Sequence, residues 1–367
     1  MIMTTFIQLH LLTAYAPSNL NRDDLGRPKT AKMGNSDRLR ISSQSLKRAW
    51  RKSDFFTGSL KGNIGFRSRK FIIEWVYNPM IEEGISEEMA RSCAIKIADL
   101  YRKTKSENEE KKGKDKKGKD KSNKLESEQL IHISNNERKE INKLVECLIC
   151  EKREPNKEEL SKLLKTRKEN DSIDIALFGR MLAAKTEFNI EAACQVSHAL
   201  GVSTVTIEDD FFTAVDDLNE DNFDASSAHL GERGFASALF YTYVCISRDL
   251  LLENLNGDEI LVEKTLKALT ESAAKVAPTG MQNSFASRAY TSYLLIEKGS
   301  QQPRSLAVAY FNPIRSQDLV NDAITRLEEQ RDKFDKVYGQ CADSRYVLNS
   351  ETGEGTLSAA LDFVAQK

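Results

Sequence analysis

The stretch Arg38-Leu-Arg-Ile-Ser-Ser-Gln-Ser-Leu-Lys-Arg-Ala-Trp-Arg-Lys-Ser53 predicts a short strand that runs directly into a helix. Leu39 and Ile41 would face one side of the strand, and Arg38 and Arg40 the other, because successive strand residues point to opposite faces. The two serines that follow can cap a helix with their side-chain oxygens. We therefore expect a strand–turn–helix unit whose turn is rich in hydroxyl groups and cations.

The expected helix carries one apolar stripe and two basic stripes. Leu46 and Trp50 lie four residues apart and form the apolar stripe. The basic stripes are formed by Lys47 with Arg51 and by Arg48 with Lys52. A helix N-terminus flanked by hydroxyl groups and cations can hold phosphates. The same pattern also fits an ordinary amphipathic helix with a solvated basic face, and periodicity alone leaves these two interpretations evenly balanced.

Length and charge limit the class of protein without deciding its function. The 367 residues allow two domains, or one domain with a large insertion, and 40% apolar residues can bury a sizeable core. The net charge is −1, so no global excess marks a nucleic-acid-binding protein. The charge is uneven, however, because the first 70 residues are basic and residues 208–224 are acidic. This asymmetry permits a basic surface on a nearly neutral protein.

Cysteine usage and hydropathy favour a cytoplasmic location. Six cysteines are scattered through the chain, which is typical of reduced thiols. The first twelve residues are too polar and too short for a signal sequence, and they predict a first strand instead. No apolar run approaches the length of a membrane span. We therefore expect a cytoplasmic protein without a membrane partner.

The remaining patterns predict an α+β protein. Further strands are expected over 241–247 and 290–297, and helices over 258–275, 318–337 and 357–366. Residues 17–34 predict a long ordered loop that carries Arg22, Arg27, Lys29 and Lys32. Residues 202–242 predict a long hairpin or extended arm. A few strands with helices on one face fit an RNA-recognition-motif-like (RRM-like, or ferredoxin-like) sheet interrupted by a large helical insertion.

The expected insertion is helical on both sides of a charged segment. Helices over 60–100 are expected to be separated at Pro79, and helical periodicity returns over 136–168. Residues 104–124 contain no apolar side chain, and Lys-Lys-Gly-Lys-Asp occurs twice in tandem at 111–120. This segment is either a mobile solubilising linker, which its composition favours, or a salt-sensitive phosphate contact.

Two segments follow the insertion. Residues 174–183 predict an apolar strand or turn, in which a bend at Gly179 presents Arg180 and Met181 at the surface. A helix is expected over 191–200.

Metal-binding and catalytic patterns are weak. The four histidines have no ligand spacing, and the lone CxxC pair of Cys147 and Cys150 lies among apolar residues that favour a packed helix face over zinc. The acids of residues 208–224 are dense enough to suggest a two-metal nuclease, but they lack calcium-loop spacing and better fit a solvated edge or a surface for a basic partner. The loop at Gly280 lacks a nucleotide-binding fingerprint; it is either an ordinary connection or a close approach to a sugar-phosphate chain. We therefore expect no metal and no cofactor.

Nucleic-acid binding is the function that these features favour, and five blocks of sequence sharpen this prediction. The blocks are Asn19–Leu25, Arg40–Ser53, Asp174–Met181, Phe211–Leu218 and Ser227–Gly231. Together they resemble the CasC family, the CRISPR-RNA-binding backbone subunits of the type I-E Cascade complex. The resemblance covers most of the chain and is weak only over residues 60–170 and the last 50 residues.

The resemblance implies a palm, fingers and a thumb. The palm would comprise residues 1–61, 196–204 and 239–367, the helical fingers residues 62–195, and the β-hairpin thumb residues 205–238. It also implies a non-catalytic scaffold whose copies stack head to tail along a CRISPR guide RNA and join other Cascade subunits. The thumb would kink the guide at regular intervals, and a complementary target DNA strand would pair between the kinks.

Three groups of contact residues follow from the resemblance together with the patterns above. The expected RNA contacts are Asn21, Arg22, Lys29, Arg40, Ser42, Gln44, Ser45, Lys47, Arg48, Arg51, Arg180, Met181, Gln282, Asn283 and Arg315. The expected thumb residues at the kink are Phe212, Thr213, His229 and Leu230. The expected DNA contacts on the fingers are Lys111, Lys112, Lys114, Lys116 and Lys117.

Two other functions compete with the scaffold. A nuclease would use Asp23, Asp24, Asp216 or Asp217 to cut a paired strand. A general RNA chaperone would bind any single strand and assemble with no fixed partner. Magnesium-dependent cutting would identify the nuclease, and co-purification with a repeat-derived RNA would exclude the chaperone.

Overall fold

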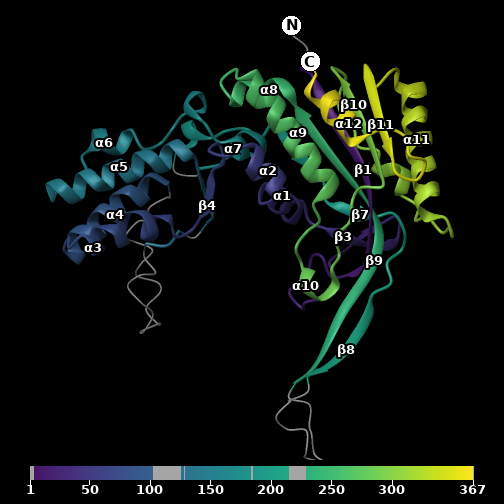
Figure 1. Cartoon of the computed structure of the whole chain (residues 1–367), viewed down its shortest axis with the longest axis horizontal. Coiled ribbons are helices and arrows are strands. Elements are labelled where there is room, and N and C mark those ends of the chain that lie inside the picture. The colour runs from purple at the N-terminus through teal and green to yellow at the C-terminus, as the bar shows by residue number, and fades with distance from the viewer. Residues whose placement is uncertain (1–3, 102–124, 128, 183–184, 215–228, 367) are drawn as a thin grey trace, which may run out of the picture. The chain divides into compact units, whose positions relative to one another are not determined.

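The computed structural model describes residues 4–101, 125–127, 129–182, 185–214 and 229–366 (Figure 1). The chain forms two compact units. We call residues 1–59, 195–248 and 263–367 the sheet unit, and residues 60–194 and 249–262 the helical unit.

The sheet unit is built around a single antiparallel sheet. Its strand order is β11-β10-β1-β9-β7-β3-β2. The strands are β1 (Phe6–Ser18), β2 (Thr30–Met33), β3 (Ser36–Ile41), β7 (Ala199–Gly201), β9 (His229–Ser247), β10 (Tyr293–Gly299) and β11 (Ser344–Asn349). Four of them, β10-β1-β9-β7, have the 4-1-3-2 order of a ferredoxin-like βαββαβ unit, with a helix after β1 and another after β9. The expected α+β class with an RRM-like sheet is therefore confirmed.

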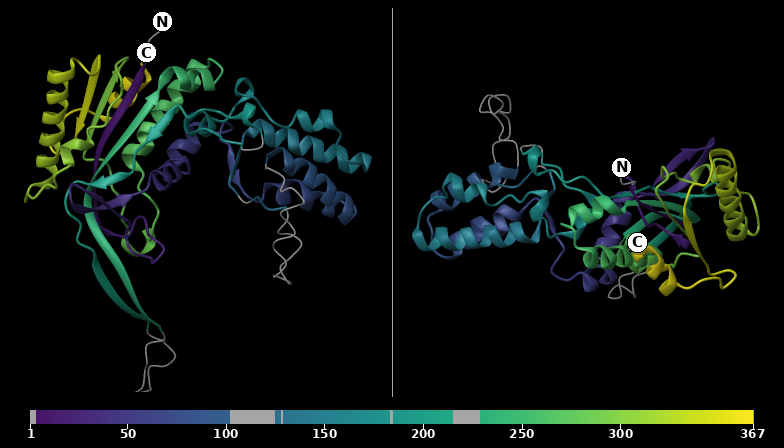
Figure 2. Two further views of the ribbon diagram at one scale, coloured as in Figure 1. Left: turned by 180° about the vertical axis from the view of Figure 1, so that it is seen from behind. Right: turned by 90° about the horizontal axis from the view of Figure 1, so that it is seen from above.

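Helices cover both faces of this sheet, not one face as the sequence suggested, since alternate residues of β1 pack against helices on opposite sides. On one face, Leu11 and Thr13 lie beneath α1 (Ser43–Arg51) and the C-terminal end of α9 (Glu259–Lys275). On the other face, Leu12 packs in a cluster with α11 (Leu319–Tyr338). Figures 1 and 2 show α9 and α11 on opposite sides of the strands.

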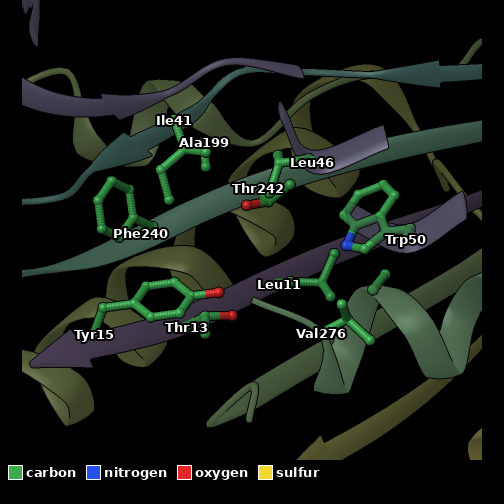
Figure 3. Close-up of a pocket in the computed structure, with 11 residues that line it drawn as sticks. Leu11, Thr13, Tyr15, Ile41, Leu46, Trp50, Ala199, Phe240, Thr242 and Val276 are labelled. Atoms are coloured by element: carbon green, nitrogen blue, oxygen red, sulfur yellow. The ribbon is translucent and has the colours of Figure 1, made fainter. Parts of the chain in front are cut away.

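The α1 face of the sheet is tightly packed. Leu46 and Trp50 insert from α1 towards Leu11 and Val276, as Figure 3 shows. The void between them measures about 10 Å³, which is about the least that one water molecule needs. The apolar stripe of α1 is therefore core, as its periodicity predicts, and this void is not a ligand pocket.

A buried polar network crosses the opposite face of the sheet. His10 Nδ1 lies 2.8 Å from the Tyr241 hydroxyl, and His10 Nε2 lies 3.2 Å from Glu297. Arg304 and Arg345 also donate to Glu297. Burial opposes ionisation of Glu297, but the bonds from His10 and Arg304 outweigh it and hold its pKa below the usual range. Because the arginines balance the carboxylate, His10 stays neutral, and burial lowers its pKa.

Acidification below pH 6.5 is expected to weaken the fold through His10. An unfolded His10 takes up a proton near its ordinary pKa of 6.5, whereas the buried imidazole does so only at lower pH. The unfolded state then binds more protons, so the free energy of unfolding falls by at most about 1.4 kcal/mol per pH unit for this group. Urea unfolding between pH 7.5 and 5.5 measures the slope. A His10→Gln variant should have a shallower slope, and an unchanged slope would contradict the assignment.

An arm of two strands extends from the sheet. The strand β8 (Glu208–Ala214) pairs with the first part of β9, in a register that runs from Glu208 opposite Phe235 to Ala214 opposite His229. β9 continues beyond this hairpin into the sheet, where it pairs with β1 (Figure 1). The expected long hairpin is thus confirmed over the described residues. Residues 215–228, including Asp216 and Asp217, lie outside them.

The helical unit has its own apolar core, which includes Phe71, Val76, Met80, Ile97 and Leu148. Its helices include the π-helix η1 (Ile73–Tyr77), α3 (Asn78–Glu82), α4 (Glu87–Tyr101), α5 (Asn135–Glu151), α6 (Lys157–Ser161), α7 (Ile173–Phe178) and most of α8 (Arg248–Asn254). A small sheet pairs β4 (Phe66–Ser68) with β5 (Ile131–Ile133).

Three expected local structures in residues 60–200 are wrong. Pro79 does not interrupt the helical path: the π-helix η1 continues directly into α3, and Pro79 lies in the first turn of α3, where a missing amide hydrogen is tolerated. The chain turns at Gly84, whose φ is 78°. Residues 173–178 form α7 rather than a strand or turn. The expected helix over 191–200 contains two short strands, β6 (Cys194–Val196) and β7, which pair with distant strands.

The described residues bear on two further expectations, which concern the CxxC pair and membrane spans. In α5, Cys147 is partly buried and Cys150 is exposed, and no group of three or more potential metal ligands occurs among the described residues. Within the same residues, no helix has the length and apolar character needed to cross a bilayer.

Candidate nucleic-acid interface

A groove of about 470 Å³ joins three separate segments of the sheet unit. We call it the loop–helix groove. It is lined by Leu20, Asn21, Arg22, Asp23, Ser45, Arg48, Ala49, Thr279, Gly280 and Met281. Ser45, Arg48 and Ala49 share one face of α1 because they lie three and four residues apart. The helix α1 thus contributes one wall of the groove, and residues 20–23 and 279–281 contribute the other two.

The first turn of α1 is held by acceptors from the protein itself. Ser42 caps the helix, and its Oγ accepts the amide of Ser45 at 3.3 Å. The amide of Ser42 donates to Asn21 Oδ1 at 2.9 Å, and that of Ser43 donates to His198 Nδ1 at 3.2 Å. These three amides already have acceptors within the chain. The phosphate site that the sequence suggests here therefore stays a prediction, and it depends mainly on the side chains around the helix.

The loop wall is shaped by Asp23. Its Oδ1 accepts the amides of Leu25 and Arg27, each at 2.9 Å. The amide of Lys29 donates to the Asn21 carbonyl at 2.8 Å, which closes the loop. Arg22 is held on this closed loop with an exposed side chain. The carboxylate of Asp23 therefore has a structural role in the turn.

Gly280 brings the third wall into contact with the loop. A Cβ at this position would lie 2.2 Å from the carbonyl oxygen of Leu20, so only glycine allows this approach. The next residue, Met281, has a φ of 47° and begins the short helix α10 (Gln282–Phe285). The sequence left open whether a sugar-phosphate chain approaches Gly280 closely. In the structure, the group that lies close to Gly280 is the backbone of Leu20.

A group of cations surrounds His198 on the other side of α1. Partial burial lowers the pKa of His198, and the positive charges of Arg40, Lys47 and Lys29 lower it further. The neutral imidazole can then accept the Ser43 amide. The sequence predicts a helix over residues 191–200, which would include His198; this residue lies instead in the link between β6 and β7. A turn between two very short strands gives little sequence signal, so this residue was missed.

Two expected RNA contacts prove to be buried. Arg51 is 9% exposed and lies towards the core side of α1, so it is not a surface cation beside Lys47. Arg180 donates two bonds of 2.7 Å to Glu137, and both side chains are at most 2% exposed. The bend at Gly179 is present, with a φ of 76°, but it turns only Met181 outward, at 81% exposure. The expectation of surface positions for Arg51 and Arg180 is therefore wrong.

The other expected contacts are distributed as follows. Asn21, Arg22, Ser45 and Arg48 line the loop–helix groove, and Lys29, Arg40 and Lys47 lie near His198. Gln44, Asn283 and Arg315 are exposed but do not line this groove. Gln282 has a buried Nε2 without an acceptor among the described residues. Lys111, Lys112, Lys114, Lys116 and Lys117 lie outside the described residues.

The hairpin presents its two phenylalanines differently. Phe212 lies against its partner strand, with the Arg233 guanidinium 4.1 Å from its ring centroid, and a Cβ on Gly231 would lie 2.3 Å from the ring. Phe211 is 67% exposed. Thr213 is exposed and pairs with Leu230, and His229 pairs with Ala214. Phe211, which the sequence analysis did not select, is thus the more accessible aromatic residue.

A second groove of about 460 Å³ lies where the hairpin leaves the sheet. We call it the hairpin-root groove. It is lined by Arg22, Leu25, Gly26, Arg27, Asp209, Glu232, Arg233, Gly234 and Met281. Since Arg22 and Met281 line both grooves, the two are neighbours. Together they contain four arginines, Arg22, Arg27, Arg48 and Arg233, and three acidic residues, Asp23, Asp209 and Glu232, so their side chains carry a net positive charge that can attract an extended anion.

Comparisons with known proteins agree with this geometry. A family model described as CT1975-like protein matches residues 7–365. A chain from a "CRISPR RNA-guided surveillance complex, pre-nicking" is 26% identical, with a TM-score of 0.79 over 98% of this chain and 99% of that chain. A chain from another "CRISPR RNA-guided surveillance complex" is 22% identical, with a TM-score of 0.70 and the same coverage, and shows the likeness of fold alone. No curated protein matches the sequence.

Proposed function

The chain belongs to the CT1975-like protein family, and from this premise we propose that it is a backbone subunit that binds CRISPR RNA as a scaffold in a Cascade-type surveillance complex. Membership agrees with the CasC-like resemblance of the five sequence blocks. The observation that carries the proposal is the loop–helix groove, which brings Arg22 and Arg48 together from separate segments.

The groove fits the backbone of an RNA better than its bases. Arg22 and Arg48 provide charge, and the hydroxyl groups of Ser45 and Thr279 provide hydrogen bonds. Contacts of these kinds with phosphate and ribose fix the register of a nucleic acid without reading its sequence. A scaffold for guides of many sequences requires this property, because recognition of the target is left to base pairing.

The finer part of the proposal concerns assembly. The sheet unit without its hairpin acts as the palm, the helical unit as the fingers and the hairpin as the thumb. Copies stack head to tail along the guide of a type I-E complex, the thumb kinks the guide at regular intervals, and complementary DNA pairs between the kinks. The exposed Phe211 supports a wedging role for the hairpin, since aromatic side chains replace the lost stacking of a displaced base.

We propose no catalytic role for the chain. Among the aspartates that a nuclease would use, Asp23 accepts two backbone amides of its own loop. This engagement favours a structural role.

Co-expression with a repeat–spacer RNA and the other complex subunits tests the proposal. We expect the purified complex to carry RNA of one defined length and to leave a paired complementary strand intact in magnesium. RNA of random lengths, without assembly, would instead identify a general RNA chaperone. Cutting of the paired strand that is lost in an Asp23→Asn or Asp24→Asn variant would identify a nuclease.

A further inference from the structure

Asn19 occupies the point at which β9 changes its partner. β1 ends at Ser18, after an irregularity in its register, and Ser18 is paired with Ala236 of β9. The next residue of β9 towards the arm, Phe235, already pairs with Glu208 of β8. The hairpin therefore leaves the sheet within one residue. A strand that loses one neighbour and gains another at such a point can swing unless something ties it to the sheet unit.

The side chain of Asn19 provides such a tie. It is 1% exposed, and its Nδ2 donates to the carbonyl oxygens of Gly26 and Gly234, each at 2.9 Å. One carbonyl belongs to the loop that lines the loop–helix groove, and the other belongs to the root of the hairpin. A single amide group thus links the two segments.

Two further contacts reinforce this link at the surface. Arg27 donates to both carboxylate oxygens of Asp209, at 3.0 and 3.3 Å. A Cβ on Gly234 would lie 3.2 Å from Pro28, so the loop and the hairpin root approach closely. The ion pair is partly exposed, so its contribution to global stability is small. Its position, however, joins the same two segments as Asn19.

We propose that Asn19, supported by the Arg27–Asp209 pair, is a positioning residue that sets the direction in which the hairpin leaves the guide-binding loop. This inference rests on the proposed function, since the direction of the hairpin matters because the hairpin meets the guide. Asn19 lines neither groove, and it acts through the two carbonyl groups. We call Asn19 and the Arg27–Asp209 pair the hairpin lock. The lock therefore controls the spacing of hairpin contacts along the RNA rather than the strength of phosphate binding.

A change of charge can distinguish an effect on the direction of the hairpin from an effect on the electrostatic attraction of RNA. An Asp209→Asn substitution removes the negative charge that pairs with Arg27, so electrostatics alone predicts unchanged or tighter binding of RNA. The lock predicts the loss of regular spacing from the same change. Asp210→Asn is a matched control, because this substitution removes the same charge. Asp210 is the exposed neighbour of Asp209, points to the opposite face of the strand and lies across from Arg233.

The experiment compares hydroxyl-radical footprints of a repeat–spacer RNA in the assembled complex of the full-length protein, with affinity measured in parallel. For Asn19→Asp, which keeps the shape but loses both donor hydrogens, we expect the regular footprint to disappear while affinity stays within about threefold. Asp209→Asn should weaken the regular pattern, and Asp210→Asn should leave it intact.

Several outcomes would overturn the inference. One is a regular footprint in a folded Asn19→Asp complex, and another is equal behaviour of Asp209→Asn and Asp210→Asn. A tenfold loss of affinity in parallel with the pattern would identify Asn19 as a contact residue instead. If Asn19→Asp does not fold, the pair of Asp209 and Asp210 variants decides, because both positions are exposed. Failure of the proposed function itself is distinguishable, because the unaltered protein would then give no regular footprint.

Discussion

Replacement of both Arg22 and Arg48 by alanine is expected to lower the affinity for guide RNA about 100-fold at physiological salt. The two side chains lie on facing walls of the loop–helix groove and come from segments that the fold brings together. A hydrogen bond to a charged group contributes about 1.5 kcal/mol or more, so the loss of two such bonds corresponds to roughly this factor. The dependence of log affinity on log salt should also become shallower, by about 1.4 for two phosphates on a single strand.

Fluorescence anisotropy over a salt titration measures both quantities. Lys264→Ala with Lys333→Ala is the matched control, because it removes two exposed cations of the sheet unit that do not line the groove. The control should change the affinity less than about threefold. Equal losses in the two double variants, or an unchanged salt slope for the Arg22 and Arg48 variant, would contradict the assignment of the groove.

The sequence alone offers two pairs of cations on this helix, Lys47 with Arg51 and Arg48 with Lys52, and does not choose between them. Periodicity correctly identifies the apolar stripe of the helix, since Leu46 and Trp50 are buried as it predicts, but it also places Arg51 in a basic stripe. It cannot tell which basic stripe borders a groove, because the opposing wall comes from residues 279–281, more than 200 residues later. Arg51 therefore looks like a partner of Lys47 in the sequence, whereas it is buried in the structure.

Predictions of the fold succeed where the pattern is long and fail where it is short. The 17-residue helix α9, the 20-residue helix α11 and the long β9 hairpin each show several periods of their pattern. By contrast, β6 and β7 have three residues each, and they are strands because distant strands pair with them. A segment of that length carries no decisive periodicity, so tertiary pairing determines its structure.

The buried position of Arg180 illustrates the same limit for single residues. An arginine after a glycine bend resembles an exposed functional cation. Its partner Glu137 lies 43 residues earlier and serves in the capping box that begins α5. Only the fold shows that the two meet, and this pairing leads to the largest effect on stability that we expect from a single substitution.

Arg180→Met is expected to destabilise the helical unit by about 3–5 kcal/mol, because it leaves the Glu137 carboxylate buried without a counter-charge. Arg180 also donates to the carbonyl oxygens of Lys165 at 2.9 Å and Phe188 at 3.0 Å, so the substitution leaves these acceptors unpaired as well. Glu137 retains the amides of Ser134 and Lys165, which hydrogen-bond to the carboxylate but do not neutralise it. Adding Glu137→Gln should restore part of the loss, since the buried charge is then removed.

Urea unfolding followed by tryptophan fluorescence can isolate this effect. The chain has two tryptophans, Trp50 in the sheet unit and Trp75 in the helical unit, so a Trp50→Phe background leaves one reporter for the helical unit. Arg91→Met on α4 is the control, and it should change the free energy of unfolding by less than about 0.5 kcal/mol. If Arg180→Met had no larger effect than this control, or if Glu137→Gln made the loss additive, the buried pair would not stabilise the unit as its geometry implies.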